Sequence, residues 1–193
     1  MYGLGAPAPE PAGYLQEEAL QPRGRRELGG EAVWSLSSSK EGNGIAQLRD
    51  DSTETFWQSD GVAPHTITAQ FPRKMRVAEV ALYLDYKSDE SYAPEVVQVR
   101  GGLCAQDLRE VARVSLREPS GWVRIPLTST TSAGERLPFV YTAHLQVAVL
   151  QMHSSGKDTH VRQVKLFGAE ELRGEVAPQD LVEARSLQYQ TLR

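Results

Sequence analysis

The sequence predicts an all-β domain, an antiparallel sandwich or barrel, on the strength of three observations. Between about Glu27 and Gly168, apolar and polar residues alternate in repeated short stretches, which is typical of strands with one face on a core. Loops rich in Gly, Ser, Asp and Pro separate these stretches. No long amphipathic helix lies between them, and this favours antiparallel strands over parallel βαβ units.

The predicted strands each have an apolar face that can be followed along the chain. Segments 65–71, 77–86, 95–100 and 121–127 alternate in this way; their apolar faces are formed by Ile67, Ala69, Phe71, Ala78, Val80, Leu82, Leu84, Val97, Val99, Val123, Ile125 and Leu127. Segment 144–152 carries apolar residues on both faces, so we expect it to be buried on both. Residues 45–51 are expected to form one helical turn, and Trp57 is expected to cover the core.

The chain divides into an arm, a domain and a tail. Residues 1–22 are rich in Pro, Ala and Gly, cannot bury enough apolar surface to order themselves, and are predicted to be a disordered N-terminal arm. Residues 23–170 form the predicted β-sandwich domain. Residues 171–193 carry few apolar groups and are predicted to be a tail with some helical character.

Composition excludes several classes of function. The net charge of −4 gives no general attraction to nucleic acid or to an anionic membrane. No apolar run approaches the length of a membrane span, and the N-terminus has neither the basic start nor the apolar block of a signal peptide. Cys104 is the single cysteine, so no internal disulfide can form, and we expect a reducing compartment, nucleus and cytoplasm. We expect Cys104 itself to be a small buried hydrophobe.

The sequence motifs of common catalysts and metal sites are missing. There is no Gly-rich phosphate loop, HExxH or CxxC, and the histidines do not share metal-ligand spacing. The acidic residues Asp50, Asp51, Glu54 and Asp60 could supply an acid–base pair or a calcium site, but turn and cap chemistry accounts for them more simply. We therefore expect no catalytic residue, metal or cofactor, with a structural calcium left open.

One polar constellation stands out at the start of the last predicted strand. In a strand, His160 and Arg162 share a face with Val164 and Leu166. The last two would lie in the core, so the first two would continue that face past its end, where loops gather and ligands bind. Asp158 could pair with Arg162 or orient His160. Two interpretations stay open: a binding site, or polar residues that satisfy one another at a strand end.

Two further loops have the composition of recognition surfaces. Residues 86–94, "YKSDESYAP", set serines and acidic residues between two tyrosines, and tyrosine is common at protein contacts. Residues 53–61, "TETFWQSDG", add Gln58, Ser59 and Asp60. Together with the constellation above, these loops suit recognition of a peptide or a sugar.

At these residues the sequence resembles a known family. "AVWSLSSSKEGNGIAQLRDDSTETFWQSDG", "YKSDESYAP", "EPSGWVRIPL" and "GKDTHVRQVKLF" are similar, in order, to the Doc domain family of anaphase-promoting complex subunit 10, over about Arg26 to Phe167. The resemblance implies a jelly-roll β-sandwich of the galactose-binding, discoidin-like type, without catalysis. It implies a substrate-recognition role in that ubiquitin ligase, in which a WD40 activator and this subunit together bind destruction-box degrons and promote processive ubiquitination in cell-cycle control.

The resemblance also implies which residues bind. The degron-binding positions carried over are Ser88, Asp89, Glu90, Ser91, Tyr92, Asp158, Thr159, His160, Arg162 and Gln163. The last residues, "YQTLR", resemble the family's tail, which implies that Leu192 and Arg193 bind a TPR-repeat subunit. The family tail usually ends in Ile-Arg, and a Leu-for-Ile change keeps volume and apolarity. Residues 134–142 look like an extra loop, and residues 1–22 show no resemblance.

A carbohydrate-binding module is the alternative function, because related sandwiches bind sugars. The missing signal peptide and disulfides disfavour an extracellular lectin, and the ordered motifs disfavour it more strongly. A Doc-like domain inside some other ubiquitin ligase is a third possibility, which the short length and the terminal Leu-Arg disfavour.

Overall fold

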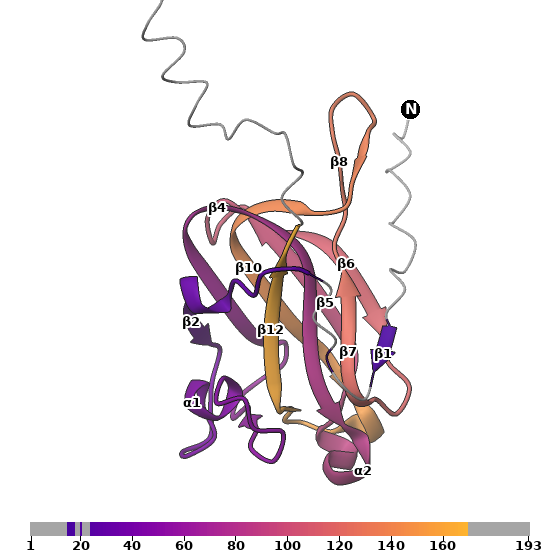
Figure 1. The fold of residues 1–193 in the computed structure, drawn as a ribbon. Coiled ribbons are helices and arrows are strands. Elements are labelled where there is room, and N and C mark those ends of the chain that lie inside the picture. Colours follow the sequence, from indigo (N-terminus) through magenta and orange to yellow (C-terminus); the bar gives the residue numbers. More distant parts are fainter. Residues whose placement is uncertain (1–14, 18–19, 21–23, 170–193) are drawn as a thin grey trace, which may run out of the picture.

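The computed structural model describes residues 15–17, 20 and 24–169, which form a β-sandwich (Figure 1). The predicted tail, with Leu192 and Arg193, lies outside the described residues. The elements in chain order are β1 (Leu15–Glu17), η1 (Gly29–Glu31), β2 (Val33–Leu36), α1 (Ile45–Leu48), β3 (Trp57–Gln58), β4 (His65–Asp85), α2 (Tyr86–Asp89), η2 (Glu90–Tyr92), β5 (Pro94–Gly102), β6 (Arg109–Ser115), β7 (Ser120–Pro126), β8 (Ser129–Thr130), β9 (Arg136–Leu137), β10 (Val140–Met152), η3 (His153–Ser155), β11 (His160–Val161) and β12 (Gln163–Gly168). None of the described helices is long and apolar enough to cross a membrane.

Strand β4 belongs to both layers of the sandwich. Its first part pairs with β2 and β10, and its second part pairs with β7 and β12, always antiparallel. One layer thus contains β2, the start of β4, β10, β5 and β6, and the other contains β12, the end of β4, β7 and β1. The sequence predicted two strands, 65–71 and 77–86, where the structure has one of 21 residues.

The bend of β4 explains why the sequence suggested two strands. Pro72, Arg73 and Lys74 are exposed and fall where the register between β4 and β10 shifts, from Gln70 to Met75. Proline has no N–H to give to a ladder, so it is tolerated at such an unpaired corner. The alternation therefore breaks at the corner although the strand continues through it.

The core consists of the apolar faces that the sequence predicted. The inward residues of β4, β5 and β7, together with Leu127 directly after β7, are all at most 3% exposed: Ile67, Ala69, Phe71, Ala78, Val80, Leu82, Leu84, Val97, Val99, Val123, Ile125 and Leu127. Trp57 is completely buried and donates from Nε1 to the carbonyl of Ser38 at 2.9 Å, which confirms its place in the core. The predicted helical turn is α1.

Two local predictions need correction. Leu145, Val147 and Val149 are buried as expected, but of the three residues predicted to be buried on the other face Ala148 alone is buried, and Gln146 and Leu150 are half-buried. Cys104 is exposed rather than buried, because it lies in the turn between β5 and β6.

The predicted arm also needs correction, because part of it packs on the second layer. Leu15–Glu17 pair with Trp122–Arg124 of β7 as strand β1, and Leu20 packs against a cluster of Ala81, Trp122 and Phe167. Arg25 then reaches Glu79, which Arg124 already holds through Nη2 at 2.7 Å. Alternation in sequence did not indicate β1, because a three-residue edge strand is fixed by its partner and not by its own pattern.

Removing residues 1–23 is expected to lower the free energy of unfolding by about 1–1.5 kcal/mol relative to a chain that begins at Leu15. The shorter chain loses β1 and the half-buried Leu20, and full burial of a leucine side chain stabilises a protein by about 1.5–3 kcal/mol. Urea unfolding of the two chains measures the difference. Equal midpoints would show that residues 15–20 add nothing to the sandwich.

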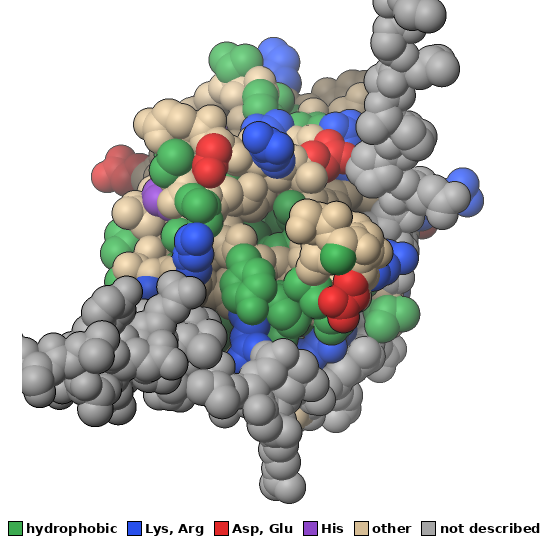
Figure 2. All heavy atoms as spheres, turned by 90° about the horizontal axis from the view of Figure 1, so that it is seen from above, with side chains coloured by type: hydrophobic (Ala, Val, Ile, Leu, Met, Phe, Trp, Pro, Cys, Tyr) green, Lys and Arg blue, Asp and Glu red, His purple; other side chains and the backbone are tan. Residues whose placement is uncertain are grey.

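The two ends of the sandwich differ in chemistry. The β8–β9 hairpin projects from the end opposite α1 and α2 (Figure 1), and residues 140–142 of the predicted extra loop are instead the start of β10. Figure 2 looks onto this end, where basic and hydrophobic side chains lie next to one another. Tyr141, 53% exposed, packs edge-on against Phe139, over which the Arg76 guanidinium lies at 5.7 Å. The degron-binding positions expected from the sequence all lie at the other end.

Candidate functional site

The α1–α2 end of the sandwich, called the mouth from here on, gathers the loops that the sequence predicted as a site. Strand β4 begins and ends here, β5 begins here and β10 ends here (Figure 1). Antiparallel strands return the chain to the same end, so the segments at 49–64, 86–92 and 153–162 come together although they are far apart in sequence.

A buried carboxylate, Asp89, binds both His160 and Arg162. Asp89 accepts Arg162 Nε at Oδ2 and Nη2 at Oδ1, each at 3.0 Å, and Oδ1 also accepts His160 Nδ1–H at 3.1 Å. The three residues are between 4% and 8% exposed. The sequence suggested Asp158 for this role, and the structure corrects it: Asp158 accepts a hydrogen bond from Ser59 instead.

His160 is held between two aromatic rings. Its ring centroid lies 4.1 Å from that of Phe56 and 4.2 Å from that of Tyr92, with interplanar angles of 22° and 11°. Arg162 donates from Nη1 to the carbonyl of Thr53 at 2.8 Å. The buried group therefore ties the segment before β12 to the two loops that precede β3 and β5.

The charges of this group stabilise one another. Burial alone would raise the pKa of Asp89, but hydrogen bonds from His160 and Arg162 and the charge of Arg162 outweigh it and lower that pKa below its usual value of 3.8. Burial opposes the charge of Arg162, yet Asp89 raises the pKa of the guanidinium above its usual value. Both groups are charged at neutral pH, so the ion pair is a constant structural support beneath the site.

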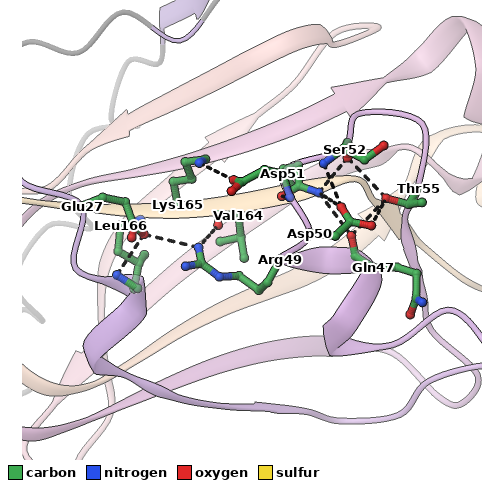
Figure 3. Close-up of polar contacts among 12 residues, drawn as sticks. Glu27, Gln47, Arg49, Asp50, Asp51, Ser52, Thr55, Val164, Lys165 and Leu166 are labelled. Carbon is green, nitrogen blue, oxygen red and sulfur yellow. Dashed lines mark hydrogen bonds and ion pairs between the residues drawn. The ribbon is translucent and has the colours of Figure 1, made fainter.

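Gln163 organises the loop after α1. Its Nε2 donates to Asp50 Oδ1 at 2.8 Å and to the carbonyl of Ser52 at 2.7 Å, and its Oε1 accepts from the N–H of Asp51 at 3.3 Å. Figure 3 shows Asp50, Ser52 and Thr55 together at this loop. A residue expected to bind ligand thus has its polar atoms committed to the protein.

Turn chemistry accounts for Asp50, whereas Asp51 forms an ion pair. Asp50 accepts from Ser52 N and, at 2.6 Å, from Thr55 Oγ1, and the Thr55 bond is the main cause of its lowered pKa. Asp51 pairs with Lys165 on β12 at 2.5 Å (Figure 3). Within residues 15–17, 20 and 24–169, His, Cys, Asp and Glu side chains form no group of three that could hold a metal ion.

The residues expected to bind a degron fall into two sets. The base set is buried and bonded within the protein: Asp89, Thr159, His160, Arg162 and Gln163. The rim set is exposed or half-buried: Ser88, Glu90, Ser91, Tyr92 and Asp158. The base holds the rim in position, for example through Thr159 Oγ1, which donates to the carbonyl of Tyr92 at 3.1 Å.

A shallow open depression of about 440 Å³ adjoins the rim. It is lined by Tyr86, Lys87, Glu90, Ser91, Glu118 and Ser154. Glu90, Glu118 and Ser154 all have positive φ values, between 44° and 52°, a strained backbone that tends to cluster at functional sites. Sequence reasoning missed Glu118, although it opens the quoted stretch "EPSGWVRIPL", since its nearness to loop 86–92 is visible only in the fold.

The fold and the mouth define a class of protein, the galactose-binding-like jelly-roll sandwich with a polar site on the loops of one end. Two solved structures of carbohydrate-binding modules from Clostridium perfringens share the fold. The CBM32-1 and CBM32-2 domains of ZmpB in complex with GalNAc match with a TM-score of 0.67 at 10% identity, covering 86% of this chain and 41% of that one. The family 32 module of NanJ in complex with galactose matches at 0.60 and 9%, covering 74% and 98%.

Sequence comparison identifies the family. The model of "Anaphase-promoting complex, subunit 10 (APC10)" matches residues 7–192, which extends the resemblance into both the predicted arm and the tail. Anaphase-promoting complex subunit 10 of Homo sapiens is 49% identical over 142 residues, 74% of each chain, and that of Schizosaccharomyces pombe is 38% identical over 164 residues, 84% of each. The chain belongs to the family of anaphase-promoting complex subunit 10, the Doc domain family.

Proposed function

We propose that this chain is a non-catalytic subunit that recognises substrates for the anaphase-promoting complex, as a co-receptor with a WD40 activator for destruction-box degrons. In that role it promotes processive ubiquitination in cell-cycle control, in the nucleus and the cytoplasm. The observation that carries the proposal is the rim of Ser88, Glu90, Ser91, Tyr92 and Asp158 supported on a bonded, buried base. A rim whose supporting side chains are already fixed loses little entropy when a peptide binds.

The chemistry of the rim suits a short extended peptide. Carboxylates of Glu90 and Asp158 and the hydroxyls of Ser88 and Ser91 can bond main-chain N–H groups and polar side chains. Tyr92, 39% exposed, offers apolar area with a polar tip. No part of this arrangement needs a nucleophile or a metal, in keeping with a binding role.

The site gives less support to the carbohydrate-binding alternative. Phe56 and Tyr92 cover both faces of the His160 ring, and Asp89 and Thr53 engage the Arg162 guanidinium. The Arg162 guanidinium is therefore engaged within the protein, and the His160 ring is buried between two aromatic rings. A glycan array run beside a degron-peptide titration separates the two functions, and glycan binding without peptide binding would favour the alternative.

Changing Glu90→Gln and Ser91→Ala together is expected to reduce processivity on a destruction-box substrate about tenfold, since hydrogen bonds to charged groups contribute about 1.5–3 kcal/mol each. The assay uses the variant in the assembled ligase. Glu135→Gln with Ser132→Ala, at exposed positions of the β8–β9 hairpin, is the matched control and should leave processivity unchanged. Normal processivity of the rim variant, with normal incorporation, would reject the proposed function.

The C-terminal Leu192 and Arg193 are proposed to bind a TPR-repeat subunit. Burial of Leu192 would contribute about 1.5–3 kcal/mol, and Arg193 and the terminal carboxylate can add charged hydrogen bonds. Such a tail alone should bind weakly, so removing both residues is expected to abolish pull-down by an isolated TPR subunit and to spare part of the binding to the whole complex. Undiminished binding to the isolated subunit would exclude the tail as its anchor.

A further inference from the structure

We propose that Ser59, which the sequence resemblance does not assign to binding, is a positioning residue for the peptide site. It fixes the carboxylate of Asp158 so that one oxygen is held by the protein and the other is presented to a hydrogen-bond donor of the ligand. The proposal rests on the proposed function, because Asp158 belongs to the rim.

The Ser59 hydroxyl uses both of its hydrogen-bonding roles on one segment. It accepts from the N–H of Thr159 at 2.9 Å and donates to Asp158 Oδ1 at 3.3 Å. Ser59 and Thr159 are both 0% exposed, so water does not compete for these bonds. A hydroxyl has a single proton, and the acceptor bond with Thr159 leaves that proton for Asp158.

Main-chain pairing fixes the position of Ser59 relative to the rim. The N–H of Ser59 donates to the carbonyl of Thr159 at 3.1 Å, and Gln58 pairs with His160 in the β3–β11 ladder. The pairing fixes the Ser59 main chain, and the hydroxyl could turn away from Asp158 only by leaving the buried Thr159 N–H without its acceptor.

A second buried residue secures the same segment one position earlier. His65, 0% exposed, lies with Nε2 2.7 Å from the carbonyl of Lys157. A carbonyl only accepts, so Nε2 carries the proton, and Nδ1 has no partner among the described residues. The bonds at Lys157, Asp158 and Thr159 hold the main chain of the segment in place, and the Asp158 side chain remains half-buried beside the exposed Lys157.

We therefore expect the rim to prefer a hydrogen-bond donor of the ligand at Asp158. Asp158 Oδ1 is occupied by Ser59, and in the part of the chain that the structure describes no side chain or N–H is bonded to Oδ2. A carboxylate oxygen accepts hydrogen bonds and repels other acceptors. The ligand group that fits is a donor, either a peptide N–H or the side chain of Asn, Gln, Lys or Arg.

A double-mutant cycle in the assembled ligase tests the proposal. Asp158→Ala and Ser59→Ala are each expected to lower processivity on a destruction-box substrate about tenfold, and Ser59→Ala is expected to have no further effect in the Asp158→Ala background. Ser59→Cys keeps the size and a weak donor and should be intermediate. If the loss of processivity in the double alanine variant equalled the product of the two single losses, Ser59 and Asp158 would act independently and the proposal would be overturned.

Two further variants separate the possible explanations: Thr142→Ala controls for lost stability, and Glu90→Gln/Ser91→Ala reports on the proposed function itself. Thr142→Ala removes another fully buried hydroxyl, bonded to Gly102 and His144 at the opposite end, and should destabilise the fold without lowering processivity. An equal loss with Thr142→Ala would mean that Ser59 acts only through stability, which overturns the proposal. If Glu90→Gln/Ser91→Ala loses processivity while Asp158→Ala and Ser59→Ala do not, the proposal fails and the proposed function stands.

Discussion

Replacing Arg162 by leucine is expected to lower the free energy of unfolding by about 3–5 kcal/mol, because the change leaves Asp89 charged and buried without its main partner. Asp89 is 4% exposed and receives two of its hydrogen bonds from this one guanidinium. Urea unfolding of the full chain measures the loss. The sequence left open whether Arg162 binds a ligand or pairs with neighbouring polar residues, and the buried ion pair with Asp89 gives it a structural role.

The double replacement Asp89→Leu/Arg162→Leu is the control, since removing both partners of a buried pair costs less than removing one. A double variant as unstable as Arg162→Leu would show that the charge left behind is not the cause. Acid gives a second check. The pKa of Asp89 is lowered in the folded state, so its contribution is constant at neutral pH, present above the unfolded pKa of about 3.9, and lost as pH falls below that value. Asp89→Asn should lose less stability over that range than the unchanged protein.

Changing Gly156 to alanine is expected to destabilise the mouth by about 1–3 kcal/mol, the usual cost of overpacking. A Cβ at this position would lie 1.9 Å from the carbonyl oxygen of Ser91, and main chain cannot move aside as a flexible side chain can. Loop 90–92 is itself fixed through the bond from Thr159 to Tyr92. We therefore expect the rim to shift and processivity in the assembled ligase to fall with it.

Gly30→Ala is the matched control, because a Cβ at Gly30 meets nothing within 4 Å. Thermal unfolding and the processivity assay should both distinguish the two variants. Gly156→Ala with the stability and processivity of Gly30→Ala would show that loops 90–92 and 153–156 can separate at no cost.

The long strands β4, β5, β7 and β10 were predictable from the sequence because each has a core face of its own. Ile67, Val80 and Ile125 mark such faces by spacing alone, and all are buried. Which loops meet at the mouth was not predictable in the same way. Asp158 is two residues from His160 and seemed the natural partner, whereas Asp89 is 71 residues away. Partner choice depends on the return of β4 and β10 to one end, which no local pattern encodes.

The resemblance to known motifs identified the residues of the site, but it did not distinguish those that can contact a ligand from those that support them. A motif does not distinguish His160, Arg162 and Gln163 from Glu90 and Ser91. Only burial in the fold assigns the first three to the base set and the last two to the rim set. Strand β1 was missed for a related reason: its three residues are held mainly by main-chain pairing with β7, and such pairing leaves no mark in side-chain pattern.

The passage of β4 through both layers has a consequence for how the molecule opens. A strand shared by two layers joins them covalently, because its first part is hydrogen-bonded to β10 in one layer and its second part to β7 in the other. Local fluctuations are then confined to parts outside this coupling, such as the β8–β9 hairpin, which pairs only with itself in the described structure. The paired amide protons of β4 should therefore be among the slowest to exchange with solvent, whereas those of Arg73 and Lys74 at its exposed, unpaired corner should exchange faster.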